Sequence, residues 1–255
     1  MKLLVLLITF IIISCSEIIA QTTYFNGGFG YGFPVGDVVG ITQPNNVEKN
    51  VYGSFGKGLT LGLNIGHSVD DNISLDLGIW YVTGSTYEFI AYYGSAIGSS
   101  SHQVSGKTTR VMPCLKITSG NNNKLYAKFG FLLGIATTIN DDETFTASPQ
   151  TGGGSILATH EFTGGFSNGW TGAIGIDFSE NQTASLFVEV NFCQQLYKPV
   201  LETINISGQN PQTYHLVDDP NPSAPDEKLK PSFVFSTIGL TAGVKFSSSV
   251  KKKTP

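Results

Sequence analysis

Charged residues are scarce in this chain of 255 residues, at 13 %, and long apolar runs are nearly absent. The mean hydropathy is close to zero, which excludes both a disordered chain and a helical membrane protein. No stretch of about 18 apolar residues follows the N-terminus, so ordinary transmembrane helices are excluded. The net charge of −4 gives no basic footprint, and we therefore expect no nucleic-acid partner.

The N-terminus has the pattern of a secretory signal peptide. Lys2 supplies the positive start, Leu3–Ile13 the apolar core, and Ala20 the small residue before the cleaved bond. We predict removal of residues 1–20, because strand-like sequence begins soon after Gln21. The alternative is a lipoprotein cleavage in which Cys15 becomes the lipidated first residue.

Cysteine is also rare, and only Cys114 and Cys193 remain after export. An exported protein can form disulfides. The strand assignment below puts the two residues at very different heights, too far apart for a bond. We therefore predict two free thiols that serve packing.

Glycine and phenylalanine, by contrast, are abundant, with 30 and 17 residues. Period-two alternation recurs along the chain, as in Leu59–Gly66 and Ile73–Ile79, and predicts strands with a different environment on each face. Six further segments complete a set of eight strands: Tyr24–Phe33, Arg110–Ile117, Leu125–Ile135, Trp170–Phe178, Ala184–Phe192 and Ser236–Phe246. Most have about 8 to 11 residues, the length of a tilted membrane-crossing strand.

The connections between these strands alternate in length. Short polar turns fall at 68–72, 118–124 and 179–183, and long segments at 34–56, 83–108, 136–165 and 193–232. This alternation puts both chain ends on the short-turn side. Outer-membrane barrels have short periplasmic turns and long extracellular loops. The sequence therefore predicts an antiparallel up-and-down transmembrane β-barrel in a bacterial outer membrane, with both termini periplasmic.

The two faces of the strands differ in chemistry. The predicted outer face carries Phe25, Phe29, Leu59, Leu61, Leu63, Ile65, Leu75, Leu77, Leu115, Phe129, Phe131, Ile174, Ile176, Val188, Val190, Leu240 and Val244. Glycine and polar residues alternate with them, among them Gly28, Gly30, Thr60, Asn64, Gly130 and Thr241. A soluble barrel with an apolar interior has the same alternation, and two features favour the inverted version.

The first is the glycine-rich inner face, which suits the confined interior of an eight-stranded barrel. The second is the depth of the aromatic residues. Phe25, Phe178 and Phe246 lie at the short-turn ends of their strands, and Phe33, Tyr81, Trp170 and Phe192 at the loop ends. Two such girdles are typical of a barrel that spans a bilayer, and we assign these seven residues to the membrane interfaces.

Several segments together resemble the small outer-membrane β-barrel family of Bacteroidetes, related in architecture to the porin-like OmpA and OmpX type. They are the Ala20-Gln21 junction, Gly27–Phe33, Arg110–Lys116, Leu125–Gly130, Leu186–Val190 and the closing strand Ile238–Phe246. The resemblance covers the whole mature chain in pattern, without a catalytic motif. It implies recognition of the last strand by the barrel-assembly machinery. The chain departs from the family in a basic tail after Phe246, which gives domains at 1–20, 21–246 and 247–255.

Ionisable residues recur on the predicted inner face. We predict a salt-bridged network that seals the barrel interior, formed by Asp76, Arg110, Lys116, Lys128, Asp177, Glu189 and Lys245. A proton or ion path through them is the alternative. A diffusion pore is not expected, because side chains fill the interior of an eight-stranded barrel.

The sequence contains no recognisable catalytic motif, and we predict no catalytic, cofactor or metal site. A lipid-modifying barrel enzyme remains the alternative function, with Ser101, His102 and one of Asp141, Asp142 or Glu143 as candidate triad. A secreted soluble ligand-binding barrel is the second alternative. Our first hypothesis is a non-enzymatic envelope protein whose partners are outer-membrane lipids and an extracellular molecule bound by the four long segments.

Overall fold

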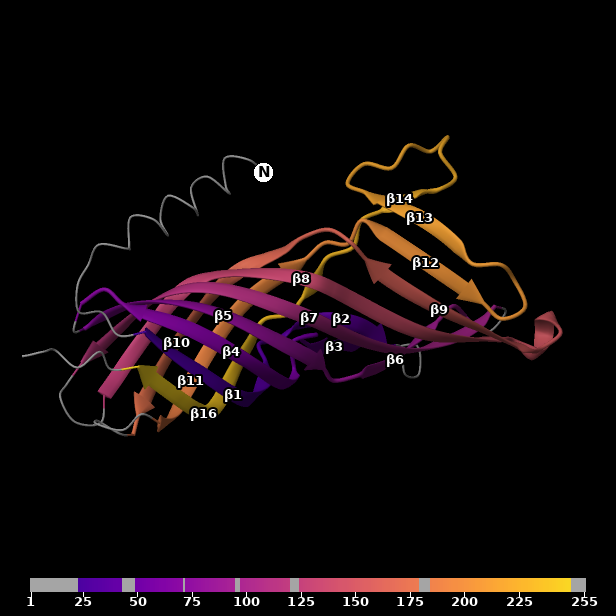
Figure 1. Cartoon of the computed structure of the whole chain (residues 1–255). Coiled ribbons are helices and arrows are strands. Elements are labelled where there is room, and N and C mark those ends of the chain that lie inside the picture. Colours follow the sequence, from indigo (N-terminus) through magenta and orange to yellow (C-terminus); the bar gives the residue numbers. More distant parts are fainter. Residues whose placement is uncertain are drawn as a thin grey trace, which may run out of the picture.

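Figure 1 shows a computed structural model of the chain, in which residues 23–42, 49–70, 72–94, 97–119, 124–178 and 184–248 are described. The predicted signal peptide (1–20), both candidate cleavage sites and most of the predicted tail (247–255) lie outside these residues. The last strand runs through Ser247 and Ser248, two residues beyond Phe246.

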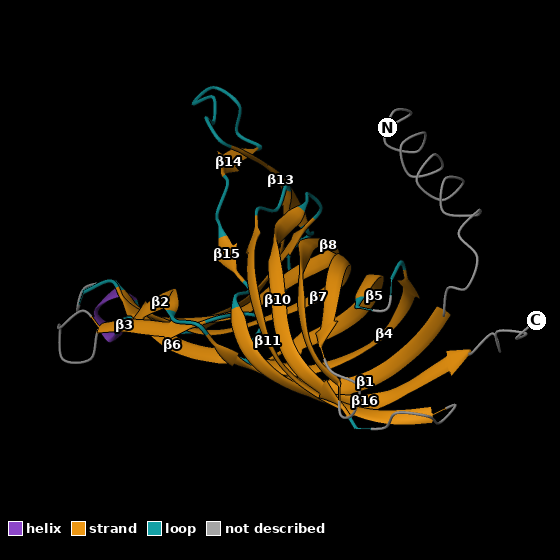
Figure 2. Ribbon diagram, turned by 90° about the vertical axis from the view of Figure 1, so that its left-hand side faces the viewer, coloured by secondary structure: helices purple, strands orange, loops and turns teal. Residues whose placement is uncertain are grey.

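All eight predicted strands are present, and they close into a ring. The ring strands are β1 (Thr23–Pro34), β4 (Gly58–Ser68), β5 (Ile73–Gly84), β7 (Gly98–Ser119), β8 (Lys124–Ala147), β10 (Ser167–Asp177), β11 (Ala184–Tyr197) and β16 (Thr237–Ser248). Each pairs antiparallel with the next in chain order, and β16 pairs with β1 to close the ring. Figure 2 shows these strands curving around a common axis.

The prediction of eight strands was incomplete, because the four long segments also contain strands. They hold β2 (Asp37–Thr42), β3 (Lys49–Gly53), β6 (Tyr87–Tyr92), β9 (Ser155–Thr163), β12 (Leu201–Ile206), β13 (Gln212–Val217) and β14 (Glu227–Leu229), with a 3₁₀ turn η2 at Pro149–Thr151. The short strand β15 (Phe233–Val234) directly follows the last of these segments. Strands β7 and β8 continue far beyond the ring, to 22 and 24 residues. No helix in the described part of the chain is long and apolar enough to cross a membrane.

Strands β2 and β3 pair with each other as a separate two-stranded sheet, and β15 pairs with the ring strand β11. The other added strands form an extension of the ring sheet on the loop side of the ring. It has the order β6-β7-β8-β9-β12-β13-β14, and only the β13–β14 pair is parallel. A register shift between Lys107 and Thr109, opposite a positive φ of 50° at Ala136, marks where β7 and β8 leave the ring. Figure 1 shows the extension as a twisted sheet beyond the ring, with β9 and β12–β14 along one side of it.

The wall of the ring has the two faces that the alternation predicted. Apart from the partly exposed Ile176 and Val244, every side chain assigned to the outer face is exposed, up to 69 % for Leu63 and Ile174. The polar side chains assigned to the inner face are buried or half-buried. The interior therefore holds the charged groups, whereas the exterior carries the aliphatic ones.

An aromatic cluster fills the loop-side end of the interior. It consists of Phe55, Tyr87, Val104, Ile139, Tyr197 and Phe235, with Val51, Phe89, Phe162 and Phe233 packed against it. The ring of Phe55 lies within 6.0 Å of Tyr87 and Phe235 in edge or tilted contacts. These residues come from the loop-side ends of the ring strands and from the segments between them, so the long segments fold back over the mouth of the ring.

Candidate functional site

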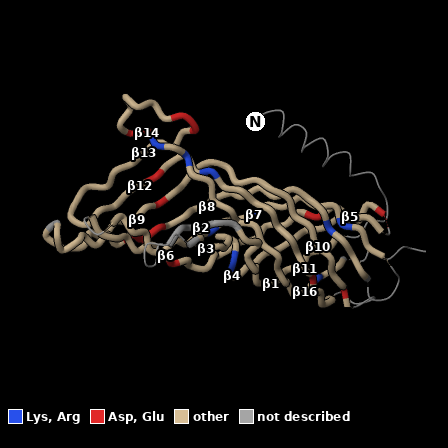
Figure 3. The backbone as a smooth tube through the Cα atoms, turned by 180° about the vertical axis from the view of Figure 1, so that it is seen from behind, with Lys and Arg blue, Asp and Glu red and all other residues tan. Residues whose placement is uncertain are grey.

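One carboxylate and two lysines form an ion triplet at the short-turn end of the ring interior. Asp177 Oδ2 accepts hydrogen bonds from Lys245 Nζ at 2.9 Å and from Lys116 Nζ at 3.2 Å. Asp177 is the last residue of β10, while the lysines come from β16 and β7. This ion triplet ties three strands together at the end where Figure 3 shows charged residues gathered in the ring. The other charges in Figure 3 follow the extension.

A second group lies further inside. Lys128 Nζ is 3.0 Å from Glu189 Oε2 and 3.6 Å from Asp76 Oδ2. The second distance is that of an ion pair rather than a hydrogen bond. Three lysines and three carboxylates thus face one another in the interior, and their formal charges cancel.

Two tyrosines connect these groups, and the sequence analysis did not single them out. Tyr24 donates a hydrogen bond to Asp76, and Tyr126 donates one to Glu189 at 3.0 Å. The Lys116 ammonium lies 3.9 Å from the centre of the Tyr126 ring, and that of Lys245 lies 4.5 Å from the centre of the Tyr24 ring. Both tyrosines have the strand parity of the inner face, a signal that could have identified them.

Glycines make room for these rings. A Cβ atom at Gly66, across from Tyr24 in β4, would collide with the Tyr24 ring, and one at Gly175 in β10 with the Tyr126 ring. Glycine is therefore required at these two inner-face positions, because the tyrosine rings occupy the space that a side chain would need.

Arg110 lies apart from the other six predicted network residues. Its Nε donates to Gln195 Oε1 at 2.8 Å and its Nη2 to the backbone oxygen of Phe235 at 2.9 Å. It therefore binds the aromatic cluster at the loop side rather than a carboxylate. The reason is its position in β7, six residues before Lys116 and thus nearer the loop-side end.

Between Arg110 and Glu189 lies a cavity of about 40 Å³, lined also by Trp80 and Cys193. A volume of this size holds very few water molecules. The paired charges fill the interior below it, and the aromatic cluster lies above it. Side chains therefore fill most of the interior of the ring.

The two cysteines are free, as predicted, but they lie closer in register than the sequence analysis placed them. Cys114 pairs with Gly130, Gly130 with Thr171, and Thr171 with Cys193, so all four share one row across β7, β8, β10 and β11. The position of each residue along its own strand did not reveal that the two cysteines share a register row, because the row depends on how the strands between them are paired. Cys193 Sγ contacts Thr171 Oγ1 at 3.5 Å.

A second polar cluster lies on the extension and alternates histidines with carboxylates. His102 Nδ1 is 3.0 Å from Asp141, and His160 lies between Glu143 at 3.2 Å and Glu202 at 2.8 Å. The two ring nitrogens of His160 thus face two carboxylates, and only an imidazolium can donate to both. His160 and Glu202 come from β9 and β12, strands that the sequence analysis did not predict.

The pKa values of this cluster favour charged forms. Hydrogen bonding to Glu202 raises the pKa of His160 above its usual range. Burial alone would lower the pKa of His102, but its hydrogen bond and charge attraction to Asp141 outweigh burial and raise it. Burial would raise the pKa of Glu143, yet the Ser100 hydroxyl and the two histidines hold it below the usual value. The cluster is therefore a set of mutually supporting ion pairs across β7, β8, β9 and β12.

The candidate triad does not assemble. His102 does contact Asp141 and Glu143, but the side chain of Ser101 is exposed on the opposite face of β7. The neighbouring Ser100 donates to Glu143 at 2.5 Å instead. Within the described residues no serine hydroxyl bonds to a histidine, and no group of three or more His, Cys, Asp or Glu is arranged to hold a metal.

The seven aromatic residues assigned to membrane interfaces all lie on the exterior. Phe25, Phe33, Tyr81, Trp170, Phe178, Phe192 and Phe246 are between 43 % and 58 % exposed. Phe25 and Phe246 are register partners at the short-turn end, and Trp170 stacks beside Phe129 and Phe131 near the loop side. Their exposure leaves about half of the surface of each ring uncovered by the described part of the chain.

The chain is thus an all-β protein with a closed ring of eight antiparallel strands and a charged interior. No family model matches it, and no curated protein matches it. Among solved structures it is similar to the outer membrane protein OprG from Pseudomonas aeruginosa, at 15 % identity and a TM-score of 0.48 over 91 % of this chain and 97 % of that one. A major outer membrane protein from Thermus thermophilus is similar at 11 % identity and a TM-score of 0.47, over 89 % and 99 % of the two chains.

Proposed function

We propose that this chain is a non-enzymatic outer-membrane protein whose ring of eight strands is a transmembrane β-barrel. In this proposal the short turns and both termini are periplasmic, and the extension stands outside the cell. The observation that carries it is the inverted distribution of side chains on the ring. Apolar side chains are exposed on every ring strand, while lysines and carboxylates are buried or half-buried inside.

Solvent chemistry explains why this distribution favours a membrane. Fully burying a Leu or Ile side chain contributes about 1.5–3 kcal/mol, so a ring exposing one at every second position would be unstable and sticky in water. In a bilayer the same positions face hydrocarbon, and the closed ring leaves no strand edge unpaired. A soluble ligand-binding barrel requires an apolar interior, which is the opposite of the charged interior found here.

The paired interior supports a structural rather than a channel role. Three lysines pair with three carboxylates within the ring, and Arg110 is held by Gln195 and the Phe235 backbone. The cavity between these groups is about 40 Å³, and the aromatic cluster covers the loop side. The extension then offers a polar surface for an extracellular partner. Recruitment of such a partner, or anchoring of the envelope, is the role that this architecture favours.

The proposal is tested by gel migration of the protein from isolated outer-membrane fractions, with and without boiling in SDS. We expect the protein in that fraction, with an unboiled band that migrates differently from the boiled one. Recovery as a soluble periplasmic or secreted protein without a shift would refute the membrane assignment. In planar bilayers we further expect no steady conductance, and an open channel of defined size would contradict the sealed interior.

A further inference from the structure

The interior of the ring carries one positive charge more than its carboxylates balance. Three lysines and three carboxylates pair with one another there, so the charge that remains is that of Arg110. Arg110 is only 3 % exposed, and it forms no ion pair with any residue in the described part of the chain. A buried charge without a counter-charge is unfavourable, so the interior favours an anion beside this guanidinium group.

The protein uses only part of the hydrogen-bonding capacity of Arg110. Its Nε donates to Gln195 Oε1 at 2.8 Å and its Nη2 to the backbone oxygen of Phe235 at 2.9 Å, and both acceptors are neutral. A guanidinium group has five N–H donors. The other three find no acceptor among the residues that the structure describes. Because Arg110 lines the cavity of about 40 Å³, these donors are available to a ligand inside it.

Hydroxyl groups from other strands add donors around the same cavity. Thr60, Thr171 and Thr241 all line it. Thr241 Oγ1 accepts a hydrogen bond from Asn191 at 2.8 Å, which leaves its own hydrogen to donate elsewhere. Thr60 and Thr241 flank Gly30, where an added Cβ would lie 2.9 and 2.6 Å from their hydroxyl oxygens. The two hydroxyls therefore approach each other over a residue without a side chain.

Two protein groups at the cavity are alternatives to an external anion, and the geometry favours neither. Glu189 lines the cavity, but its Oε2 already bonds Lys128 and the Tyr126 hydroxyl, both at 3.0 Å. Its charge therefore belongs to the paired set. Cys193 Sγ lies 3.5 Å from Thr171 Oγ1, and a thiol is a weak acceptor that brings no charge.

We propose that this cavity binds one small monovalent anion of the size of chloride. Arg110 supplies the opposite charge, and the hydroxyls of Thr60 and Thr241 supply further hydrogen bonds. A volume of about 40 Å³ holds very few water molecules, so it takes a halide ion and excludes larger organic anions. The bound anion balances the charge of the ring interior. The inference goes beyond the proposed function and depends on the interior of the ring alone.

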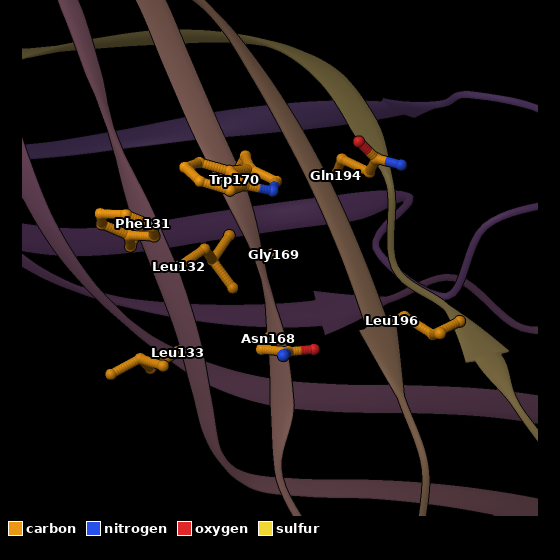
Figure 4. A pocket seen from close by; sticks show the side chains of 8 residues that line it. All are labelled: Phe131, Leu132, Leu133, Asn168, Gly169, Trp170, Gln194 and Leu196. Atoms are coloured by element: carbon orange, nitrogen blue, oxygen red, sulfur yellow. The ribbon is translucent and has the colours of Figure 1, made fainter.

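The test uses the fluorescence of Trp80, which is buried and lines the cavity. The chain has one other tryptophan, Trp170, and Figure 4 shows it beside Phe131 in a pocket on the exterior of the ring. A Trp170→Phe background removes its signal. The full-length protein is refolded in detergent micelles in sodium methanesulfonate, and bromide, which quenches tryptophan, replaces methanesulfonate at constant ionic strength. Refolding is repeated at each bromide concentration, because side chains close both ends of the cavity.

We expect quenching of Trp80 that saturates with bromide concentration and that chloride reverses by competition. Arg110→Met should lose the saturable part. The matched control Lys107→Met removes an exposed cation from the same strand, β7, and should keep it. Thr60→Val preserves the shape of the side chain without its hydroxyl. It should raise the half-saturating bromide concentration about tenfold, the effect of one hydrogen bond to a charged group.

Three results would overturn the anion site. Quenching that rises in proportion to bromide, equally with and without Arg110→Met, would mean collisional contact only. Saturable quenching that persists in Arg110→Met would place the bromide elsewhere. If Arg110→Met does not fold, an unchanged half-saturating concentration in Thr60→Val would contradict the site. None of these results bears on the membrane assignment, which the gel migration of the unboiled protein tests separately.

Discussion

Removing the charge of Asp177 should destabilise the protein more than any other single change in the interior network. One oxygen of this carboxylate accepts hydrogen bonds from two ammonium groups at 2.9 and 3.2 Å, and its side chain is only 4 % exposed. Each attraction is about 5 kcal/mol at an effective dielectric constant of about 20, before desolvation and the repulsion between Lys116 and Lys245 are subtracted. Breaking a buried pair costs about 3–5 kcal/mol, and we expect Asp177→Asn to lose an amount in this range.

The assay is guanidinium unfolding of the refolded protein in detergent micelles, followed by tryptophan fluorescence, with the slope of the transition checked for constancy. Lys116→Met should cost less, because Asp177 keeps Lys245, and adding it to Asp177→Asn should recover part of the loss. The ion pair of the exposed Asp218 with the half-buried Lys230, at 3.8 Å, provides the control, with a loss of at most about 1 kcal/mol for Asp218→Asn. A loss below about 1 kcal/mol for Asp177→Asn would refute the reasoning.

Two further predictions concern an interior glycine and the histidine cluster. Gly66→Val should prevent folding, because the new side chain collides with the Tyr24 ring. Gly172→Val should be tolerated, since the nearest atom to a Cβ at this position is 3.5 Å away. The band shift between unboiled and boiled SDS gels measures folding, and equal folding of both variants would contradict this prediction. The raised pKa of His160 stabilises the extension fully below about pH 6.5, and this stabilisation is lost as the pH rises through the pKa of the folded state. The lowered pKa of Glu143 stabilises the extension above about pH 4.5, and this stabilisation is lost as the pH falls through the pKa of the folded state. Limited proteolysis of the extension should therefore be slowest between about pH 4.5 and 6.5 and faster toward about pH 8. In His160→Gln the increase in the cleavage rate above about pH 6.5 should be smaller. An unchanged pH profile of cleavage in that variant would exclude His160 as its cause.

Alternation along the chain is enough to predict the ring strands and their faces. In β4 the aliphatic residues from Leu59 to Ile65 occupy every second position, and a strand exposes such a row on one side only. The same parity would have identified Tyr24 and Tyr126 as interior residues had it been applied to uncharged aromatics.

The extension escaped prediction because its strands lack that contrast. The part of β7 before Lys107 and the part of β8 after Ala136 are rich in serine, threonine and aspartate, and Val104 and Ile139 are isolated apolar residues among them. Such segments read as loops, since strand formation there depends on pairing between distant segments. Only the fold brings His160 of β9 and Glu202 of β12 beside Glu143.

Contacts between side chains across the ring could not be predicted either, because they also depend on the pairing of distant strands. The pairing of Asp177 with Lys116 and Lys245 depends on how β7, β10 and β16 are staggered around the ring. Arg110 shares the inner face with these residues, yet its height brings it to Gln195 instead. Parity gives the face of a residue, and register decides its partner.

The central claim is that the aliphatic exterior of the ring faces hydrocarbon, and spin labels along β4 in vesicles test it most directly. Labels are introduced one at a time at Leu61, Leu63 and the inward Thr60 and Asn64, in a variant with Cys114 and Cys193 replaced by serine. The account predicts that oxygen relaxes the labels at Leu61 and Leu63 more than a water-soluble nickel complex does, and that the inward labels are poorly accessible to both. Greater accessibility of Leu61 and Leu63 to the nickel complex would place the exterior of the ring in water and contradict the account.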